Sequence, residues 1–171
     1  SVYLGFCLLP FASHANLPLN KWYLYKTLKS KLKISKKFVM FALEIQSIML
    51  KIKQIVNQIR SQFTDEVTFE LGMLVRHVGV FYPDFISLTT AAKMVTVEEK
   101  ELLLKIIEEK CILQALAKKP FFNGLELRQK YKLKGKEIKD ALNYQDKWMI
   151  LNPEKTIDEF MEDLYNLINT K

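Results

Sequence analysis

The sequence contains little glycine, proline, cysteine or histidine, and each shortage excludes a class of protein. Five Gly and five Pro in 171 residues are too few for a collagen-like or low-complexity chain, and they leave an all-β sandwich without the turn residues it needs. With 49% hydrophobic and 26% charged residues, the composition suits one globular domain of ordinary size or two small ones. We therefore expect an all-α fold.

The two cysteines and two histidines are too few for the common stabilising sites. Cys7 and Cys111 both lie among apolar neighbours, and a secreted scaffold of this length normally carries more cysteines, so we predict reduced, buried thiols in an intracellular protein. His14 and His77 have no Cys or His partner at the spacing of zinc ligands, which excludes a structural zinc site.

The apolar segment 1–12 lacks the features of a leader peptide or a membrane span. No basic segment precedes it, it contains Gly5 and Pro10, and it is shorter than the ~20 residues that cross a bilayer. A buried helix is predicted instead, and no membrane partner is expected. Because the chain opens on Ser1 within this core-like element, we interpret it as the C-terminal piece of a longer protein.

Motifs typical of catalysis are also absent. A two-metal nucleotidyl-transfer centre needs closely spaced carboxylates, and the chain has no Asp-x-Asp pair. It contains no phosphate-binding loop, dinucleotide fingerprint, zinc-protease motif or nucleophile elbow, and His77 is followed by Val78 rather than by the Asp of a phosphohydrolase dyad. We predict no catalytic residue and no metal ligand within this chain.

The positive charge is concentrated in one segment. The net charge is +7, and residues 21–60 hold ten Lys or Arg against one acid, Glu44. In the first part of this segment Trp22, Tyr23 and Tyr25 alternate with lysines. Lysines can neutralise phosphates and aromatic rings can stack on unpaired bases, so the segment is suited to RNA binding. For the three aromatic residues a place in the core is the favoured interpretation, and for the lysines a solvated face is the alternative to a polyanion-binding surface.

Apolar spacing predicts a long central helix. From residue 38 to residue 59, apolar residues recur in alternating steps of three and four, which is typical of one helical stripe. The stripe comprises Phe38, Phe41, Ile45, Ile48, Ile52, Ile55 and Ile59. We expect this helix to be packed into the core, and a coiled-coil partner helix is the alternative.

Capping residues predict the other helices of the first 119 residues. Thr64 begins a helix that runs towards Val80, in which Gly72 and Gly79 allow close helix approach. Residues 83–95 form a shorter helix, and the capping box of Thr96 and Glu99 begins one that continues through residue 116.

The remaining residues predict a small helical tail. A short helix follows Asn123, a loop covers residues 132–135, a helix spans residues 136–150, and a last helix follows Thr156. We therefore expect an irregular multi-helix body, residues 1–119, with an appended helical tail, residues 120–171. Gly135 lies at the start of a tail helix with Lys134, Lys136 and Lys139 around it. An ordinary cap with solvated lysines is the favoured interpretation, and an anion seat at this helix start is the alternative.

Several short segments, taken in order, resemble the body and tail of class II CCA tRNA nucleotidyltransferases, the CCA-adding enzymes of eukaryotic type. In the tail, Gly124 with Leu127 matches a Gly-x-x-[LI] element, and Gly135 with Ile138 matches the family's helix start. Trp148, the Asn152-Pro153 break and the final helix follow in the family's order. Upstream, residues 32–37 and 70–79 are similar to the lysine-bearing start of the family's long helix and to its Gly-x-x-[IL]-Arg-x-x-Gly segment.

The resemblance implies a tRNA partner. The body and tail of that family cradle the acceptor stem and elbow of tRNA, while the head that binds Mg²⁺ and the neck that selects CTP and ATP would precede Ser1. No cofactor is therefore expected in this piece, and the whole protein would add CCA to tRNA 3′ ends. The expected RNA-binding residues are Lys26, Lys29, Lys33, Lys36, Lys37, Lys134, Gly135 and Lys136.

Two other functions remain open on the sequence. The long apolar stripe also suits a helical adaptor that binds a partner helix and has an incidental basic face. The helical arm of a poly(A) polymerase is the third possibility. A Gly-Ser strand with Asp-x-Asp upstream of Ser1 would favour the two polymerase families, and its absence would favour the adaptor.

Overall fold

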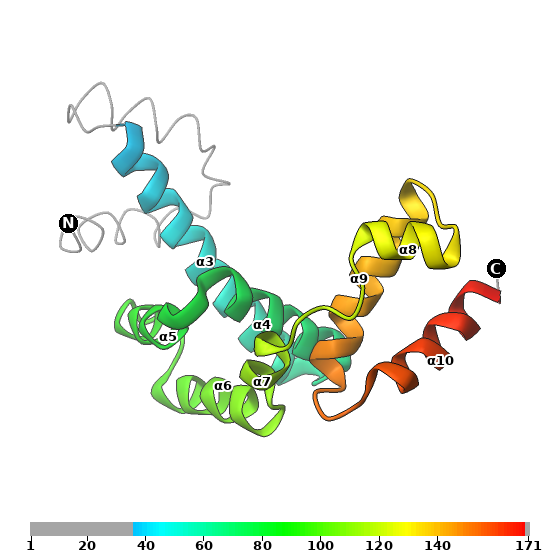
Figure 1. Ribbon diagram of the computed structural model, residues 1–171. Helices are drawn as coiled ribbons and strands as arrows, with labels where there is room; N and C mark the ends of the chain where they lie inside the picture. The colour runs from blue at the N-terminus through cyan, green and yellow to red at the C-terminus, as the bar shows by residue number, and fades with distance from the viewer. Residues whose placement is uncertain (1–35, 170–171) are drawn as a thin grey trace. The chain divides into compact units, whose positions relative to one another are not determined.

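The computed structural model describes residues 36–169, and this part of the chain contains α-helices, one short 3₁₀ helix and no strand (Figure 1). The all-α prediction is confirmed. The described residues form two compact units, the first with residues up to Asn57 and Val80–Lys100, the second with Gln58–Gly79 and the residues from Glu101 onward. The units thus group residues 101–119 with the chain that follows them, and a division at residue 119 stays a prediction.

The long helix α3, Lys36–Ser61, belongs to the first unit as far as Asn57. Of the predicted stripe, Ile48, Ile52 and Ile55 are buried, and Ile45 and Ile59 are half-buried. Phe41 is 52% exposed, so its predicted burial is wrong. Among the side chains of α3 that the structure describes, Leu43, Met49 and Val56 are also buried, and the side chain of Phe38 lies outside the described ones. A helical stripe shows which face can be buried, but each turn also needs a neighbour to cover it.

The first unit continues with α5, Tyr82–Ala91, which follows the 3₁₀ helix η1, Gly79–Phe81. The predicted helix to residue 95 ends early, because Lys93 has a positive φ of 56° and Met94 N–H turns back to Thr89 O at 3.1 Å. The predicted capping box then begins α6, Val97–Glu109: Thr96 N–H donates to Glu99 Oε2 at 2.6 Å, and Glu99 N–H donates to Thr96 Oγ1 at 3.3 Å.

The second unit holds the other helices. Thr64 caps α4, Asp65–Val78, by accepting from Val67 N–H at 3.4 Å, as predicted. The single helix expected through residue 116 is instead broken into α6 and α7, Ile112–Ala117, by Cys111, whose φ is 50°. The predicted burial of Cys111 is also wrong, because this thiol is free and half-buried at the break. Cys7 lies outside the described residues.

Helix α4 packs on α9, Lys136–Leu151, and Gly72 makes that contact possible. A Cβ atom at Gly72 would lie 2.8 Å from Ile150 Cγ2, closer than packed carbon atoms approach. Gly72 therefore has the predicted role in close helix approach. The same prediction for Gly79 is wrong, because no atom lies within 4 Å of its added Cβ and it instead ends α4 with a φ of 64°.

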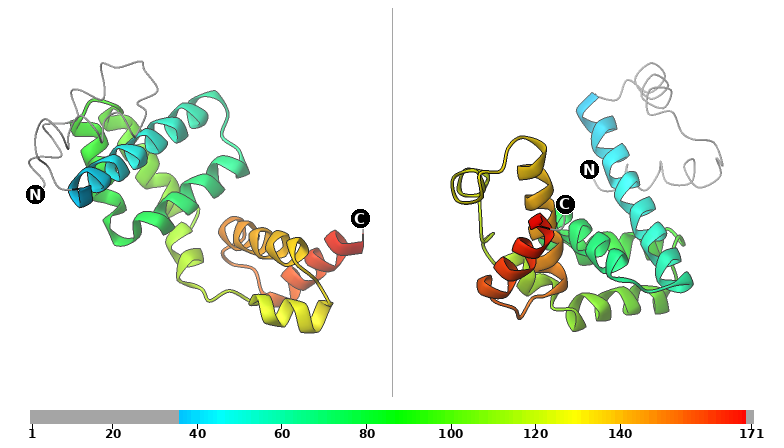
Figure 2. Two further views of the ribbon diagram at one scale, coloured as in Figure 1. Left: turned by 90° about the horizontal axis from the view of Figure 1, so that it is seen from above. Right: turned by 90° about the vertical axis from the view of Figure 1, so that its right-hand side faces the viewer.

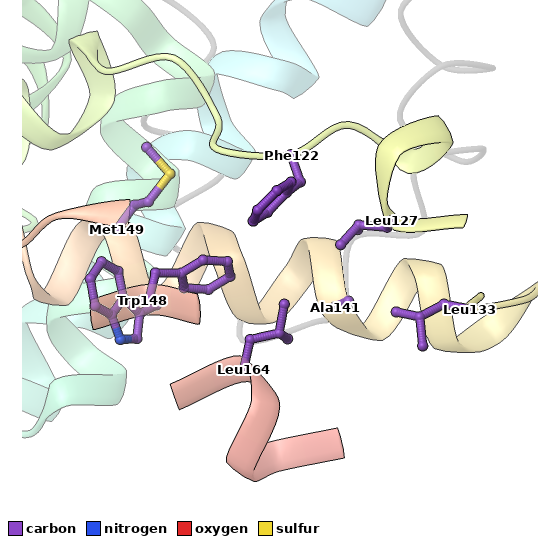
Figure 3. Packing of buried hydrophobic residues seen from close by; sticks show 8 residues of the cluster. Phe122, Leu127, Leu133, Ala141, Trp148, Met149 and Leu164 are labelled. Atoms are coloured by element: carbon purple, nitrogen blue, oxygen red, sulfur yellow. The ribbon is translucent and has the colours of Figure 1, made fainter. Parts of the chain in front are cut away.

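The tail helices α8, Gly124–Tyr131, and α10, Ile157–Asn169, pack on α9 around an aromatic core (Figures 2 and 3). The buried cluster comprises Phe122, Leu127, Leu133, Ala141, Trp148, Met149, Phe160 and Leu164. Two buried polar contacts fix its parts. Gln145 pairs with both backbone groups of Phe122, at 2.8 Å and 3.1 Å, and Trp148 Nε1 donates to Asp163 Oδ2 at 2.7 Å.

Candidate nucleic-acid interface

The predicted RNA-binding residues lie in three parts of the chain: the segment that the structure does not describe, the first unit and the second unit. Lys26, Lys29 and Lys33 lie outside the described residues. Lys36 begins α3 and Lys37 is exposed on its first turn, both in the first unit. Lys134, Gly135 and Lys136 are all exposed in the second unit, between α8 and α9. Of the predicted residues, Lys134, Gly135 and Lys136 form the one group whose surroundings the structure describes in full.

The basic surface around this group is larger than the sequence analysis predicted. Residues 128–139, which we name the basic hairpin, contain the end of α8, the connecting loop and the start of α9. Every basic side chain on it is exposed: Arg128, Lys130, Lys132, Lys134, Lys136 and Lys139. Its only acid is Glu137. The missed signal is an alternation, since every second residue from 128 to 136 is basic.

Local backbone chemistry explains why the chain reverses at this point. Helix α8 begins at a capping box in which Asn123 and Glu126 exchange hydrogen bonds, with Asn123 N–H donating to Glu126 Oε2 at 2.7 Å. It ends at Lys132 in the left-handed region, with a φ of 56°. Leu133 then inserts into the tail core, and Gly135, with a φ of 48°, turns the chain into α9. The hairpin is therefore held by the core while its lysines face solvent.

Gly135 is the N-cap of α9, as predicted, and it offers no side chain to cap the helix. Glu137 Oε2 instead accepts from Lys134 N–H, which precedes the helix, at 3.0 Å. The helix start thus already has one internal acceptor beside it, and an anion seat there stays a prediction, the alternative to an ordinary cap.

Most of the positive charge on the basic hairpin is uncompensated. Lys130 Nζ lies 5.3 Å from the ring centroid of Phe122 and 5.7 Å from that of Tyr131, so it belongs to the packing of the tail. The other basic side chains of the hairpin form no ion pair with any residue in the described range. By contrast, Arg76 on α4 pairs with Asp146 at 2.9 Å, and Lys147 pairs with Glu66.

The tyrosine of the hairpin adds no negative charge. The Tyr131 hydroxyl is buried without a hydrogen-bond partner, and burial raises the pKa of this phenol above its ordinary value. The side chain is therefore neutral at physiological pH, and the field of the hairpin is set by its lysines, its arginine and Glu137.

Metal-ligating side chains and cavities are the other features of the described residues that could form a site. Between residues 36 and 169 no group of three His, Cys, Asp or Glu side chains has an arrangement that could hold a metal ion. An open cavity of about 200 Å³ in the second unit is lined by Asp65, Glu109, Cys111 and Glu154 among others, but by no residue of the basic hairpin. No helix in this described range is long and apolar enough to span a bilayer.

Comparisons with known proteins give no relative. No protein family, curated protein or solved structure matches the chain.

Proposed function

We propose that this chain is an RNA-docking helical region whose ligand is tRNA. The observation that carries the proposal is the basic hairpin, where exposed basic side chains surround a single acid and only Lys130 is engaged in internal contacts. Such a concentration of unpaired cations attracts a polyanion and neutralises backbone phosphates. Contacts of this kind position a nucleic acid without reading its sequence.

A folded RNA fits this surface better than a flexible one. The hairpin is anchored by Leu133, which is 7% exposed, and by the core contacts of Leu127 on α8 and Ala141 on α9. Lysines on a rigid support present a fixed spacing of charges, and double-stranded RNA is recognised mainly by its shape and its backbone. A tRNA offers such a backbone in its stems and elbow.

The finer proposal is that the whole protein adds CCA to tRNA 3′ ends. It rests on the ordered motifs of the tail, from Gly124 to Trp148, and on their resemblance to class II CCA tRNA nucleotidyltransferases. Mg²⁺, CTP and ATP would bind to residues that precede Ser1. A Gly-Ser strand with Asp-x-Asp in the upstream coding sequence would support this proposal, and a helical adaptor would have neither.

Fluorescence anisotropy with labelled tRNA tests the docking function directly. Replacing Lys134 and Lys136 with Gln removes two exposed charges, and we expect tRNA to bind more weakly by up to about fivefold per lysine. The matched control replaces Lys105 and Lys110, which lie on α6 and at its end, because it changes the net charge of the chain by the same amount.

The two variants distinguish a docking surface from a general charge effect. An equal loss of affinity in both would show that only net charge matters, and the proposed surface would be rejected. Equal binding of tRNA and of a single-stranded RNA of the same length by the wild-type chain would also reject docking by shape.

The adaptor remains the second candidate because of one observation on α3. Met40 and Phe41 are each 52% exposed near the start of α3, so this end of the helix presents adjacent apolar side chains that a partner helix would cover. Replacing Met40 and Phe41 with Ser should leave tRNA affinity unchanged under the docking proposal. A loss of tRNA binding in this variant would favour the adaptor, with RNA held by its partner.

A further inference from the structure

Glu137 combines a charge that repels RNA with hydrogen bonds to a lysine of the basic hairpin. It is the only acid of the basic hairpin and is exposed among the lysines, where a carboxylate repels phosphate. Its main-chain amide and its side-chain carboxylate nevertheless both form hydrogen bonds with the backbone of Lys134. Glu137 N–H donates to Lys134 O at 2.9 Å, and Lys134 N–H donates to Glu137 Oε2 at 3.0 Å.

This pair of hydrogen bonds fixes the one part of the loop that nothing else holds. Leu133 is anchored in the tail core, but Gly135 has no side chain and its residue type has the greatest backbone freedom. Both backbone hydrogen-bonding groups of Lys134 are satisfied by Glu137 alone among the described residues. Without the carboxylate, the backbone between Leu133 and the first turn of α9 would lose one of these two bonds.

We propose that Glu137 is a positioning residue of the RNA-docking surface, which holds Lys134 and Lys136 at the spacing that a folded RNA requires. This inference rests on the proposed function. The carboxylate weakens the attraction for any polyanion through its charge, and it strengthens the preference for a folded RNA through its hydrogen bond. The two effects have opposite signs, so two substitutions separate them.

Glu137→Gln removes the charge and keeps an acceptor oxygen for Lys134 N–H. We expect tRNA and a single-stranded RNA of the same length to bind more tightly by a similar factor, so that the ratio of their affinities stays at the wild-type value. Glu137→Ala removes both the charge and the hydrogen bond. We expect single-stranded RNA to bind more tightly, as with Gln, while the ratio falls by about two- to tenfold, the value of one hydrogen bond.

Glu159→Ala is the matched control. Glu159 is exposed at the start of α10 and accepts from Thr156 N–H at 2.9 Å, so this variant loses the same charge and the same type of cap outside the hairpin. We expect it to leave the ratio unchanged. Amide hydrogen exchange gives an independent readout, since Lys134 N–H should exchange faster in Glu137→Ala than in Glu137→Gln.

The outcomes separate this inference from the function on which it rests. If wild type prefers tRNA and Glu137→Ala keeps the full preference, Glu137 is not a positioning residue although the docking surface stands. A ratio that falls equally in Glu159→Ala would overturn the inference as well. If wild type shows no preference for tRNA, the proposed function itself is rejected.

Discussion

At the scale of single residues, the Gln145 side chain forms the hydrogen bonds that a neighbouring backbone would otherwise supply to Phe122. It is 2% exposed, and its amide accepts from Phe122 N–H and donates to Phe122 O. The segment before α8 has no neighbouring strand or helix turn to pair these two buried groups. An unpaired buried donor or acceptor costs about 1–3 kcal/mol, so Gln145 is central to the attachment of this segment to α9.

Replacing Gln145 with Glu should make stability depend on pH. A protonated Glu can still donate to Phe122 O and accept from Phe122 N–H, whereas a buried carboxylate cannot donate. Burial therefore raises the pKa of the new carboxyl in the folded state. Stability close to wild type is expected below the unfolded pKa, and above it stability falls by about 1.4 kcal/mol per pH unit until the raised pKa is passed.

Urea unfolding between pH 4 and 8, in steps of about one unit, measures this effect. Gln145→Leu is the control, because it loses both hydrogen bonds and cannot titrate, so its loss should be the same at every pH. Parallel pH profiles for the Glu and Leu variants would contradict the role given to Gln145.

Acid should weaken the start of α10 through Glu159. Hydrogen bonds from the backbone and then the side chain of Thr156 lower the pKa of this carboxyl from its ordinary value of 4.5. A lowered folded-state pKa means that the contribution is present above pH 4.5 and is lost as the pH falls through the folded-state pKa. Amide exchange in the first turn of α10 should therefore increase on acidification relative to the rest of the helix, and this change should be absent in Glu159→Gln.

At the scale of helices, the contact of α4 with α9 depends on a missing side chain. Gly72→Ala places a Cβ atom 2.8 Å from Cγ2 of Ile150, which is itself only 1% exposed and has no room to move. We expect a loss of about 1–3 kcal/mol in the free energy of unfolding. Gly124→Ala is the control, because its Cβ would meet Ile138 at an ordinary 3.4 Å. Equal thermal stability of the two variants would contradict the close packing.

Helix starts were predictable because their signals are local, whereas breaks and burial were not. The capping residues Thr64 and Thr96 lie in the sequence beside the amides that they bind. No Gly or Pro marks the break at Cys111 in the sequence. The break coincides with the burial of the next residue, Ile112, which is 0% exposed. That burial is a tertiary effect, and no local pattern encodes it.

The candidate site was predictable only in part for a similar reason. Gly135 and its neighbouring lysines follow from the pattern of a helix start. Arg128, Lys130 and Lys132 belong to the same surface only because α8 ends at Lys132 and Leu133 anchors the loop. The alternation of basic residues was visible in the sequence, but the reversal that makes it one surface depends on two positive φ angles.

At the scale of the whole molecule, we propose that RNA binds to basic residues of both units, Lys36 and Lys37 at the start of α3 and the basic hairpin. Replacing Lys36 and Lys37 with Glu should weaken tRNA binding without lowering the melting temperature, since exposed charges contribute little to stability. A variant that binds tRNA like wild type would confine the surface to the second unit. A lowered melting temperature would instead indicate a structural role for the start of α3.

The salt dependence of tRNA binding tests the central claim most directly. Replacing Lys132, Lys134 and Lys136 with Gln should reduce the slope of log affinity against log salt by about 2 to 3, because each phosphate neutralised by a lysine contributes about 0.7 to 0.9. The Lys105 and Lys110 control should keep the wild-type slope. An unchanged slope in the hairpin variant, or an equal reduction in the control, would contradict the assignment of RNA docking to the basic hairpin.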